Sequence, residues 1–233
     1  MSNSSTFRSL ALLVAICFAI TTSVRAEILL NANFNNETLN QPIPLGGAAA
    51  GEPVSLDSPG MATVRQGAFS TQSLQIVDQV TTRSSPVRFE FLNSAEVTTG
   101  ILHLSLNAYF GQLGNYDFGL REQGSSSRDF FDFYTSDIGT LFVTTSTYLA
   151  NFSYSALTPL HFDFVFDMDL RTVSGSVNGM VLATDVPMGI TDRGIGALLA
   201  GQGFDADLNG KFDIDDLVVE SFPQEVFSDG FDD

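Results

Sequence analysis

The stretch LHFDFVFDM, residues 160–168, decides the fold class of this chain. A leucine, three phenylalanines and a methionine occupy every second position, and the positions between them are mostly polar or charged. Successive side chains of a β-strand point to opposite faces, whereas a helix would scatter these phenylalanines around its axis. The stretch therefore predicts a β-strand with one face in a core and a polar face that carries His161, Asp163 and Asp167.

The same period of two recurs on both sides of this stretch. Residues 102–109 alternate leucine or alanine with His103, Ser105, Asn107 and Tyr109. Six further stretches, enriched in β-branched and aromatic residues, read in the same way: 87–91, 116–121, 130–135, 140–145, 172–177 and 212–219. Turn-forming residues separate them, and no window after residue 26 has a convincing helical period. We therefore predict an all-β fold with about ten to thirteen short strands in a two-sheet antiparallel sandwich.

Two segments between the predicted strands carry strong turn signals. Asn178-Gly179 lies between two apolar runs, which is the strongest short-range signal for a β-hairpin. The proline- and glycine-rich residues 42–62 predict a long irregular connection. Too little chain precedes this connection to form a core of its own, so we do not expect a domain boundary there.

The first 26 residues have the three parts of a secretory signal. Arg8 provides the positive region, Leu10–Ile20 the apolar run, and Val24–Ala26 the small-residue cleavage pattern. No later stretch approaches the ~18 apolar residues of a transmembrane helix. We therefore expect export to the periplasm or the extracellular space, and three segments: a signal peptide at 1–26, a single β-sandwich domain at 27–221 and an acidic tail at 222–233.

Charge and cysteine content exclude several classes of partner and fold. The formal net charge is −17, from 27 acidic and 10 basic side chains. Nucleic acid is therefore not an expected partner, because phosphate binding relies on a basic surface. The single cysteine, Cys17, lies in the predicted signal peptide, so we expect no disulfide in the exported domain.

Four stretches together resemble the concanavalin A-like jelly-roll superfamily, which includes laminin G domains and legume lectins. They are Ile28–Asn35, Phe69–Val77, Leu160–Leu182 with its Val-Asn-Gly turn, and Phe212–Val219. The resemblance covers most of residues 27–221 and includes no catalytic signature. It implies a jelly roll of two curved antiparallel sheets, often with a calcium ion and often with carbohydrate at the concave face or the loop rim.

A candidate calcium loop occupies residues 205–216, DADLNGKFDIDD. Counted from its first residue, Gly210 lies at position 6 and oxygen ligands lie at positions 1, 3, 5, 9 and 12, as in an EF-hand: Asp205, Asp207, Asn209, Asp213 and Asp216. The pattern departs from an EF-hand at position 12, which is usually Glu, and in the strand that follows.

Two alternatives to the EF-hand-like loop stay open. In the first, Asn209-Gly210 is a hairpin turn and the aspartates are a solvated rim. In the second, an ion is shared between Asp215 or Asp216 and the first strand, at Asn33 or Asn35.

A candidate saccharide site lies on the polar faces of the two best-defined strands. A saccharide site needs aromatic rings together with hydrogen-bonding acids and amides. The expected ligand-binding residues are His103, Asn107, Tyr109, His161, Asp163 and Asp167, and we expect four further residues nearby: Asp117, Arg121, Asp132 and Tyr134. The alternative is that this is simply the wet face of an antiparallel sheet, and the absence of tryptophan favours that alternative.

No catalytic signature emerges from the sequence. The Glu-x-Asp-x-x-Glu pattern of jelly-roll glycosidases is missing, and so are the G-x-S-x-G turn and a reactive cysteine. We therefore expect a secreted, non-catalytic module that binds carbohydrate and is stabilised by calcium. A glycan hydrolase or lyase, with carboxylates from separate strands, and a purely structural extracellular protein are the alternatives.

Overall fold

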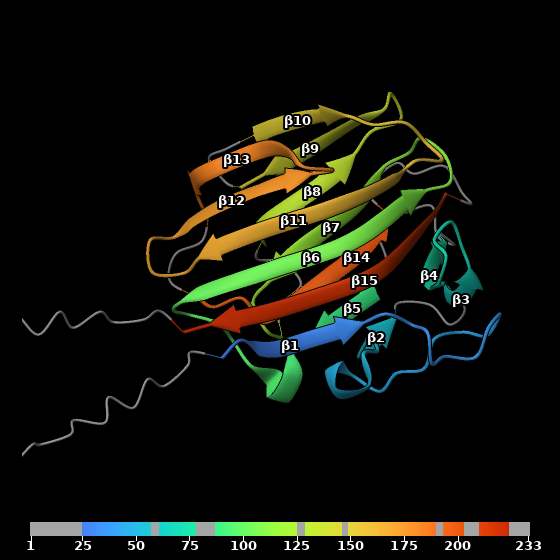
Figure 1. Ribbon diagram of the computed structural model, residues 1–233, viewed down its shortest axis with the longest axis horizontal. Helices are drawn as coiled ribbons and strands as arrows, with labels where there is room; N and C mark the ends of the chain where they lie inside the picture. The colour runs from blue at the N-terminus through green and yellow to red at the C-terminus, as the bar shows by residue number, and fades with distance from the viewer. Residues whose placement is uncertain are drawn as a thin grey trace, which may run out of the picture.

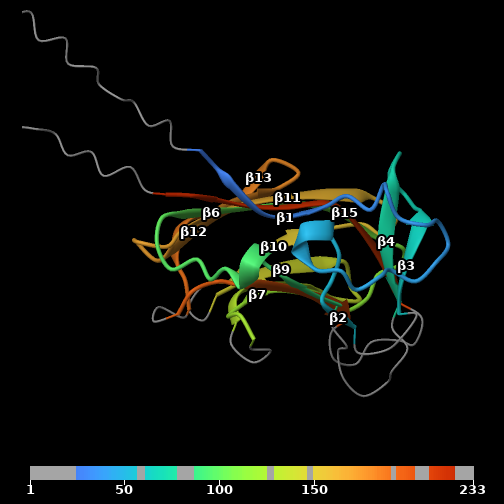
Figure 2. The ribbon, with the colours of Figure 1, turned by 90° about the horizontal axis from the view of Figure 1, so that it is seen from below.

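The computed structural model describes residues 25–56, 61–77, 87–124, 129–145, 149–189, 193–202 and 210–223. They form two antiparallel β-sheets that face each other (Figures 1 and 2). We call them sheet A and sheet B.

Sheet A contains eight strands, with the order β13-β12-β11-β6-β15-β4-β3 and with β1 paired to β15. Its strands are β1 (Glu27–Ala32), β3 (Ala62–Gln66), β4 (Gln72–Val77), β6 (Ile101–Phe110), β11 (Pro159–Asp167), β12 (Thr172–Val177), β13 (Met180–Pro187) and β15 (Lys211–Phe222).

Sheet B contains seven strands in the order β10-β9-β8-β7-β14-β5-β2. They are β2 (Ser55–Leu56), β5 (Val87–Glu90), β7 (Tyr116–Arg121), β8 (Asp129–Thr135), β9 (Thr140–Thr144), β10 (Leu149–Ser153) and β14 (Ala197–Gln202). Two short 3₁₀ turns, η1 (Ala48–Ala50) and η2 (Leu92–Ser94), lie in the connections.

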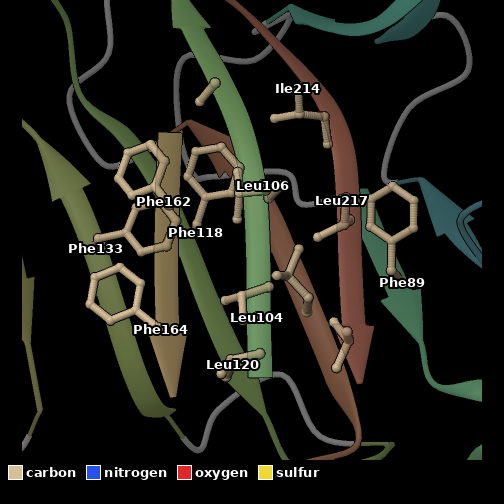
Figure 3. Close-up of a cluster of buried hydrophobic side chains, with 14 of the residues drawn as sticks. Phe89, Leu104, Leu106, Phe118, Leu120, Phe133, Phe162, Phe164, Ile214 and Leu217 are labelled. Carbon is tan, nitrogen blue, oxygen red and sulfur yellow. The ribbon is translucent and has the colours of Figure 1, made fainter. Parts of the chain in front are cut away.

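The stretch 160–168 forms β11 and turns its apolar face into the core, as predicted. Phe162 stacks on Phe133 of β8 with ring centroids 4.6 Å apart, and Phe164 lies 4.7 Å from Phe131. Figure 3 shows the rings of Phe133, Phe162 and Phe164 between the strands of the two sheets, with Leu104 and Leu106 of β6 nearby. Interleaved aromatic rings from opposite sheets fill the sandwich, because large planar side chains bury much area and favour stacked or edge-to-face contacts.

The Asn178-Gly179 hairpin is confirmed. These two residues join β12 to β13 and have φ values of 49° and 77°, the positive values that a type I′ turn requires. Asn178 also exchanges hydrogen bonds with β11, because its backbone N–H donates to the carbonyl of His161 and its side-chain Oδ1 accepts from the N–H of His161.

The strand count is higher than predicted. Fifteen strands lie within the described residues, against the ten to thirteen expected. The region 42–62, expected to be irregular, contributes the 3₁₀ turn η1 and the strand β2, which has only two residues. A pair of residues is too short to show a period of two, so pairing with β5 alone defines this strand.

Strand β15 occupies the middle of sheet A, where it pairs with β6, β4 and β1 (Figure 1). A β-bulge interrupts its pairing with β6 between Asp215 and Val218, and Asp216 there has a φ of 48°. The segment 67–71, between β3 and β4, packs on the outward face of sheet A, where Phe69 meets Tyr109 edge to face. Within the described residues, we find no helix with the length and apolar character needed to cross a lipid bilayer.

Candidate functional site

The outward face of sheet A brings four of the six predicted saccharide-binding residues together. In the first of two groups, the amide of Asn107 on β6 bridges β11 and β15. Its Nδ2 donates to Asp216 Oδ2 at 3.0 Å, so its Oδ1 accepts from His161 Nδ1 at 2.9 Å. This network assigns the Nδ1 proton of His161 and leaves Nε2 of this exposed side chain directed away from the pair.

The second group places His103 between two carboxylates. Its Nε2 lies 3.3 Å from Asp163 Oδ1 on β11, and its Nδ1 lies 3.6 Å from Glu220 Oε2 on β15. The polar ridge formed by the two groups therefore crosses three neighbouring strands of sheet A, and its side chains already use one another as hydrogen-bond partners.

The other two predicted residues lie on the same face, Tyr109 two residues from Asn107 and Asp167 at the end of β11, but they have other partners. Tyr109 packs against Phe69 near the end of β6, with ring centroids 6.5 Å apart. Asp167 closes the turn after β11, where its Oδ1 accepts hydrogen bonds from the N–H groups of Asp169 and Leu170 at 3.0 and 2.8 Å. An aspartate that caps a turn in this way has a local structural role.

Four residues that were expected near this ridge lie on the opposite side of the molecule. Asp117, Arg121, Asp132 and Tyr134 belong to β7 and β8 of sheet B, so the sandwich core separates them from β6 and β11. The expectation was wrong because alternation shows that a side chain faces outward, but not which of the two sheets its strand joins.

The outward face of sheet B carries an aromatic pair. Tyr134 of β8 and Phe142 of β9 are register partners, and their rings stack with centroids 5.0 Å apart and an interplanar angle of 21°. Tyr134 is 38% exposed. Asp117 of β7 lies opposite Tyr134, and Asn151 of β10 lies opposite Phe142. An acid and an amide thus flank an exposed aromatic plate along one row across the strands.

An ion pair lies beside this plate, directly over a glycine. Arg121 Nη1 donates to Asp132 Oδ1 at 2.7 Å, and the arginine is only 6% exposed. A Cβ atom added to Gly119 would lie 1.8 Å from Arg121 Nη1 and 2.0 Å from Asp132 Oδ1. The absence of a side chain at Gly119 therefore lets the pair lie flush against strand β7.

Two further arginines of sheet B and its loops also pair with carboxylates. On β5, Arg88 Nε lies 3.1 Å from Glu90 Oε1, and after β7 the Glu122 Oε1 atom lies 3.2 Å from Arg193 Nη1. On this side of the sandwich, Arg88, Arg121 and Arg193 are therefore each held by an acid.

Only part of the candidate calcium loop can be placed. Asp205, Asp207 and Asn209 lie outside the described residues. Asp213 and Asp216 belong to β15, an extended strand from Lys211 onward, where three residues span ~10 Å. Asp213 accepts a hydrogen bond from Gln75 Nε2 at 3.0 Å. This extended course lacks the curvature of an EF-hand loop over its second half, so the EF-hand ligand set stays a prediction.

For the alternative ion geometry, the structure describes both Asp215 and Asn35. Asp215, which is fully buried, accepts a hydrogen bond from the hydroxyl of Thr71. The next residue, Gln72, donates its backbone N–H to Asn35 Oδ1 at 3.1 Å. Asp215 and Asn35 are therefore anchored to consecutive residues at the start of β4. No group of three or more His, Cys, Asp and Glu side chains suited to a metal is found in the described part of the chain.

Burial raises the pKa of two of the aspartates of β15. Desolvation raises the pKa of Asp213, which is 4% exposed, and the hydrogen bond from Gln75 partly opposes this effect. Desolvation likewise raises the pKa of Asp215, and the hydrogen bond from Thr71 opposes it. The segment 67–71 that covers this part of sheet A removes the water that would otherwise stabilise the charged forms.

Among the site residues that sequence reasoning missed are Phe142, Gly119, Asn151 and Glu220. Phe142 lies within Leu141-Phe142-Val143, a fully apolar run in which no period of two identifies the outward position. Thr140 and Thr144 bound this run and lie two residues on either side of Phe142. Because both are polar, they were the available signal that Phe142 faces outward.

No protein-family model matches the sequence. No curated protein matches it either. Among solved structures, a sialidase is 14% identical with a TM-score of 0.63, and the match covers 84% of this chain and 19% of the sialidase. This chain therefore spans about a fifth of the length of that protein.

Two other solved structures match over nearly their whole lengths. Domain 4 of AbnA, a GH43 extracellular arabinanase from Geobacillus stearothermophilus in complex with arabinotriose, is 16% identical with a TM-score of 0.52, covering 84% of this chain and 93% of that one. The alginate lyase AlgAT5 of polysaccharide lyase family 7 is 14% identical with a TM-score of 0.54, covering 85% and 95%. With the two-sheet topology, these likenesses show that the chain has the concanavalin A-like jelly-roll fold.

Proposed function

We propose that this chain is a glycan-binding module, exported to the periplasm or the extracellular space, and that it binds saccharide on the outward face of sheet B. The observation that carries the proposal is the exposed Tyr134 stacked on the half-buried Phe142, flanked in register by Asp117 and Asn151. Sugar rings have apolar faces and hydroxyl-bearing edges. An aromatic plate with an acid and an amide at its sides matches both.

The fold supports this proposal at a general level. The jelly-roll structures that resemble this chain include a domain solved with arabinotriose and a lyase named for alginate. Because fold alone does not specify function, the argument for a particular face rests on the side chains.

The polar ridge of sheet A is a second face for the same function. It includes the predicted residues His103, Asn107, His161 and Asp163. Its hydrogen-bonding groups already partner one another, and its nearest outward tyrosine, Tyr109, packs against Phe69. Binding there would require ligand hydroxyls to replace existing hydrogen bonds, so sheet B is the favoured face.

A panel of insoluble and oligomeric glycans tests the proposal. Residues 27–233 should be retained without turnover on at least one glycan, and Tyr134→Ala should weaken that binding about tenfold, which corresponds to ~1.4 kcal/mol of lost contact. The matched control is His161→Ala, an exposed ring on the opposite face, which should bind as the wild type does. If His161→Ala lost glycan binding while Tyr134→Ala kept it, the binding site would lie on sheet A instead. The absence of binding to every glycan would contradict the proposed function.

Glycan hydrolysis is a second candidate, favoured by one observation. Asp117 faces Tyr134, and Asp132 lies two residues from Tyr134 on the same face, so the two acids are diagonal neighbours on adjacent strands. Diagonal neighbours in an antiparallel pair lie ~7–8 Å apart, within the ~5–9.5 Å range of glycosidase carboxylates. Asp132 is held in the ion pair with Arg121, so Asp117 is the acid to test. Release of reducing ends that Asp117→Asn abolishes would establish this alternative.

A further inference from the structure

We infer that the outward face of sheet B selects neutral saccharides and excludes uronates and other acidic sugars. This inference rests on the proposed function, and it concerns the class of saccharide that the same site accepts. It follows from the Arg121–Asp132 ion pair beside Tyr134, from Asp117 opposite Tyr134, and from the pairing of the other described arginines on this side of the sandwich.

The described arginines around this face are each neutralised by the protein. Arg121 pairs with Asp132, Arg88 with Glu90 and Arg193 with Glu122, at N···O distances of 2.7, 3.1 and 3.2 Å. Asp117 adds a further carboxylate next to the aromatic plate. On this side of the sandwich the three arginines are therefore matched by four carboxylates, and these side chains offer no excess positive charge to an acidic ligand.

Arg121 is also held in place by the packing around it. It is 6% exposed and lies flush over Gly119, where even a Cβ atom would collide with its guanidinium. To bind Arg121, the carboxylate of a uronate would have to break the Arg121–Asp132 ion pair. Asp132, which is partly buried, would then lose Arg121 as its partner. Breaking one side of such a pair is strongly unfavourable, because the remaining charge is left poorly solvated.

The charge of the whole chain acts in the same direction. With a net charge of −17, the protein repels a polyanion before contact is made. A neutral chain experiences no such repulsion, and its affinity should depend little on salt.

The row of side chains across the sheet suits an extended neutral chain. Asn151, Phe142, Tyr134, Asp117 and Gly201 are successive register partners on β10, β9, β8, β7 and β14. Five neighbouring strands span ~19 Å, so the row is longer than one sugar unit. It presents an amide, two rings and an acid in sequence, and it ends at a glycine, which adds no side chain to the row.

The test compares neutral and acidic oligosaccharides on the same protein. We would titrate residues 27–233 with xylohexaose, cellohexaose and arabinohexaose, and with hexasaccharides of alginate and pectate, at low and high salt. At least one neutral probe should bind at least tenfold more tightly than either uronate, with a Kd that changes less than twofold with salt. A uronate that binds more tightly, and loses affinity in Tyr134→Ala, would overturn this inference while leaving the proposed function intact. If no probe binds, the proposed function itself is contradicted.

Two charge variants test the mechanism of exclusion. Asp132→Asn removes the acid that holds Arg121, whereas Asp163→Asn removes the same charge from the opposite face of the sandwich. Asp132→Asn should raise uronate affinity at least fivefold relative to Asp163→Asn. Glu90→Gln, which removes the acid paired with Arg88, provides a second variant if Asp132→Asn fails to fold, as judged by its thermal midpoint. If Asp132→Asn and Asp163→Asn bound uronates equally well, the inference would be overturned. The net charge of the whole protein would then be enough to explain why uronates are excluded.

Discussion

At the residue scale, Gly175 shows how one missing side chain makes room for the core. Gly175 of β12 is the register partner of Phe164, and a Cβ atom there would lie 2.0 Å from Phe164 Cδ1. Phe164 is fully buried and packs against Phe131 and Phe133 of the other sheet, so it has no free space into which to move.

Gly175→Ala should therefore destabilise the domain by about 1–3 kcal/mol through overpacking. The measurement is the free energy of unfolding in urea. Ser176→Ala, on the outward side of the same strand, is the matched control and should stay within ~0.5 kcal/mol of the wild type. Equal effects of the two substitutions would mean that Phe164 adjusts without cost.

The buried aspartates of β15 predict a pH dependence. The pKa of Asp213 and that of Asp215 are both raised by desolvation, so the folded state binds protons that the unfolded state has already released. The stability that these groups contribute is full below the ordinary aspartate pKa of about 3.9. It is lost as the pH rises through the folded-state values. We expect the free energy of unfolding to fall from mildly acidic to neutral pH.

Asp213→Asn isolates this effect from the other carboxylates. In calcium-free buffer the variant should show a smaller loss of stability between pH 4 and 7 than the wild type does, as measured by urea unfolding at each pH. An unchanged slope would show that Asp213 titrates alike in the folded and unfolded states.

At the scale of single elements, the β12–β13 hairpin depends on its two turn residues. Gly179 has a φ of 77°, a conformation that is unfavourable for residues with a side chain. Gly179→Ala should cost about 1 kcal/mol, because left-handed backbone is strained by ~1–2 kcal/mol when a Cβ is present. Thermal unfolding measures this cost. A midpoint equal to that of the wild type would show that the turn can change type without loss.

The calcium hypothesis concerns residues 205–216, which end within strand β15. Calcium at 100 times its Kd should stabilise the folded domain by about 2.7 kcal/mol. That corresponds to a rise of a few degrees in the thermal midpoint. The measurement is a calcium series at matched ionic strength, starting in EDTA. A flat response would contradict calcium binding.

Variants distinguish the two ion geometries. Asp205→Ala and Asp207→Ala should remove the calcium response if the EF-hand-like loop binds the ion. Asp215→Asn should remove it if the ion lies near Asn35 and the first strand. If calcium still stabilises Asp205→Ala and Asp207→Ala, the EF-hand-like loop is not the site. If calcium still stabilises Asp215→Asn, the site near Asn35 is excluded.

At the scale of the whole molecule, the predicted signal peptide and the first strand meet at one residue. Strand β1 begins at Glu27, which pairs with Ser221 of β15, directly after the predicted cleavage site at Ala26. Removal of residues 1–26 should therefore leave sheet A complete. The mass of the protein secreted from an exporting host should correspond to a start at Glu27. A start beyond Ala32 would remove β1 and would contradict this expectation.

Much of the fold could be predicted from the sequence where the local pattern was unambiguous. The strands 116–121 and 172–177 have the predicted bounds, and β11, β6 and the Asn178-Gly179 hairpin formed as expected. Each of these predictions used information within about ten residues of chain, such as a period of two or a turn dipeptide. The two-residue strand β2 left no such local pattern.

The candidate site was only partly predictable. The sequence assigned the polar faces of β6 and β11 to one candidate site, because their alternation is regular over a long stretch, and the two strands are neighbours in sheet A. It could not separate Asp117, Arg121, Asp132 and Tyr134 from that face. Sheet membership depends on contacts between residues far apart in the chain, and a period of two is the same in either sheet.

By itself, the sequence determined that this protein is an acidic, all-β chain with a phenylalanine-rich core, because alternation and composition are local properties. The tertiary structure was needed to show that Arg121 of sheet B pairs with Asp132 beside the Tyr134–Phe142 plate, and that the histidines lie on the other side of the sandwich. The physical reason is that strand pairing and sheet packing bring together residues distant in sequence, and binding chemistry depends on those neighbours.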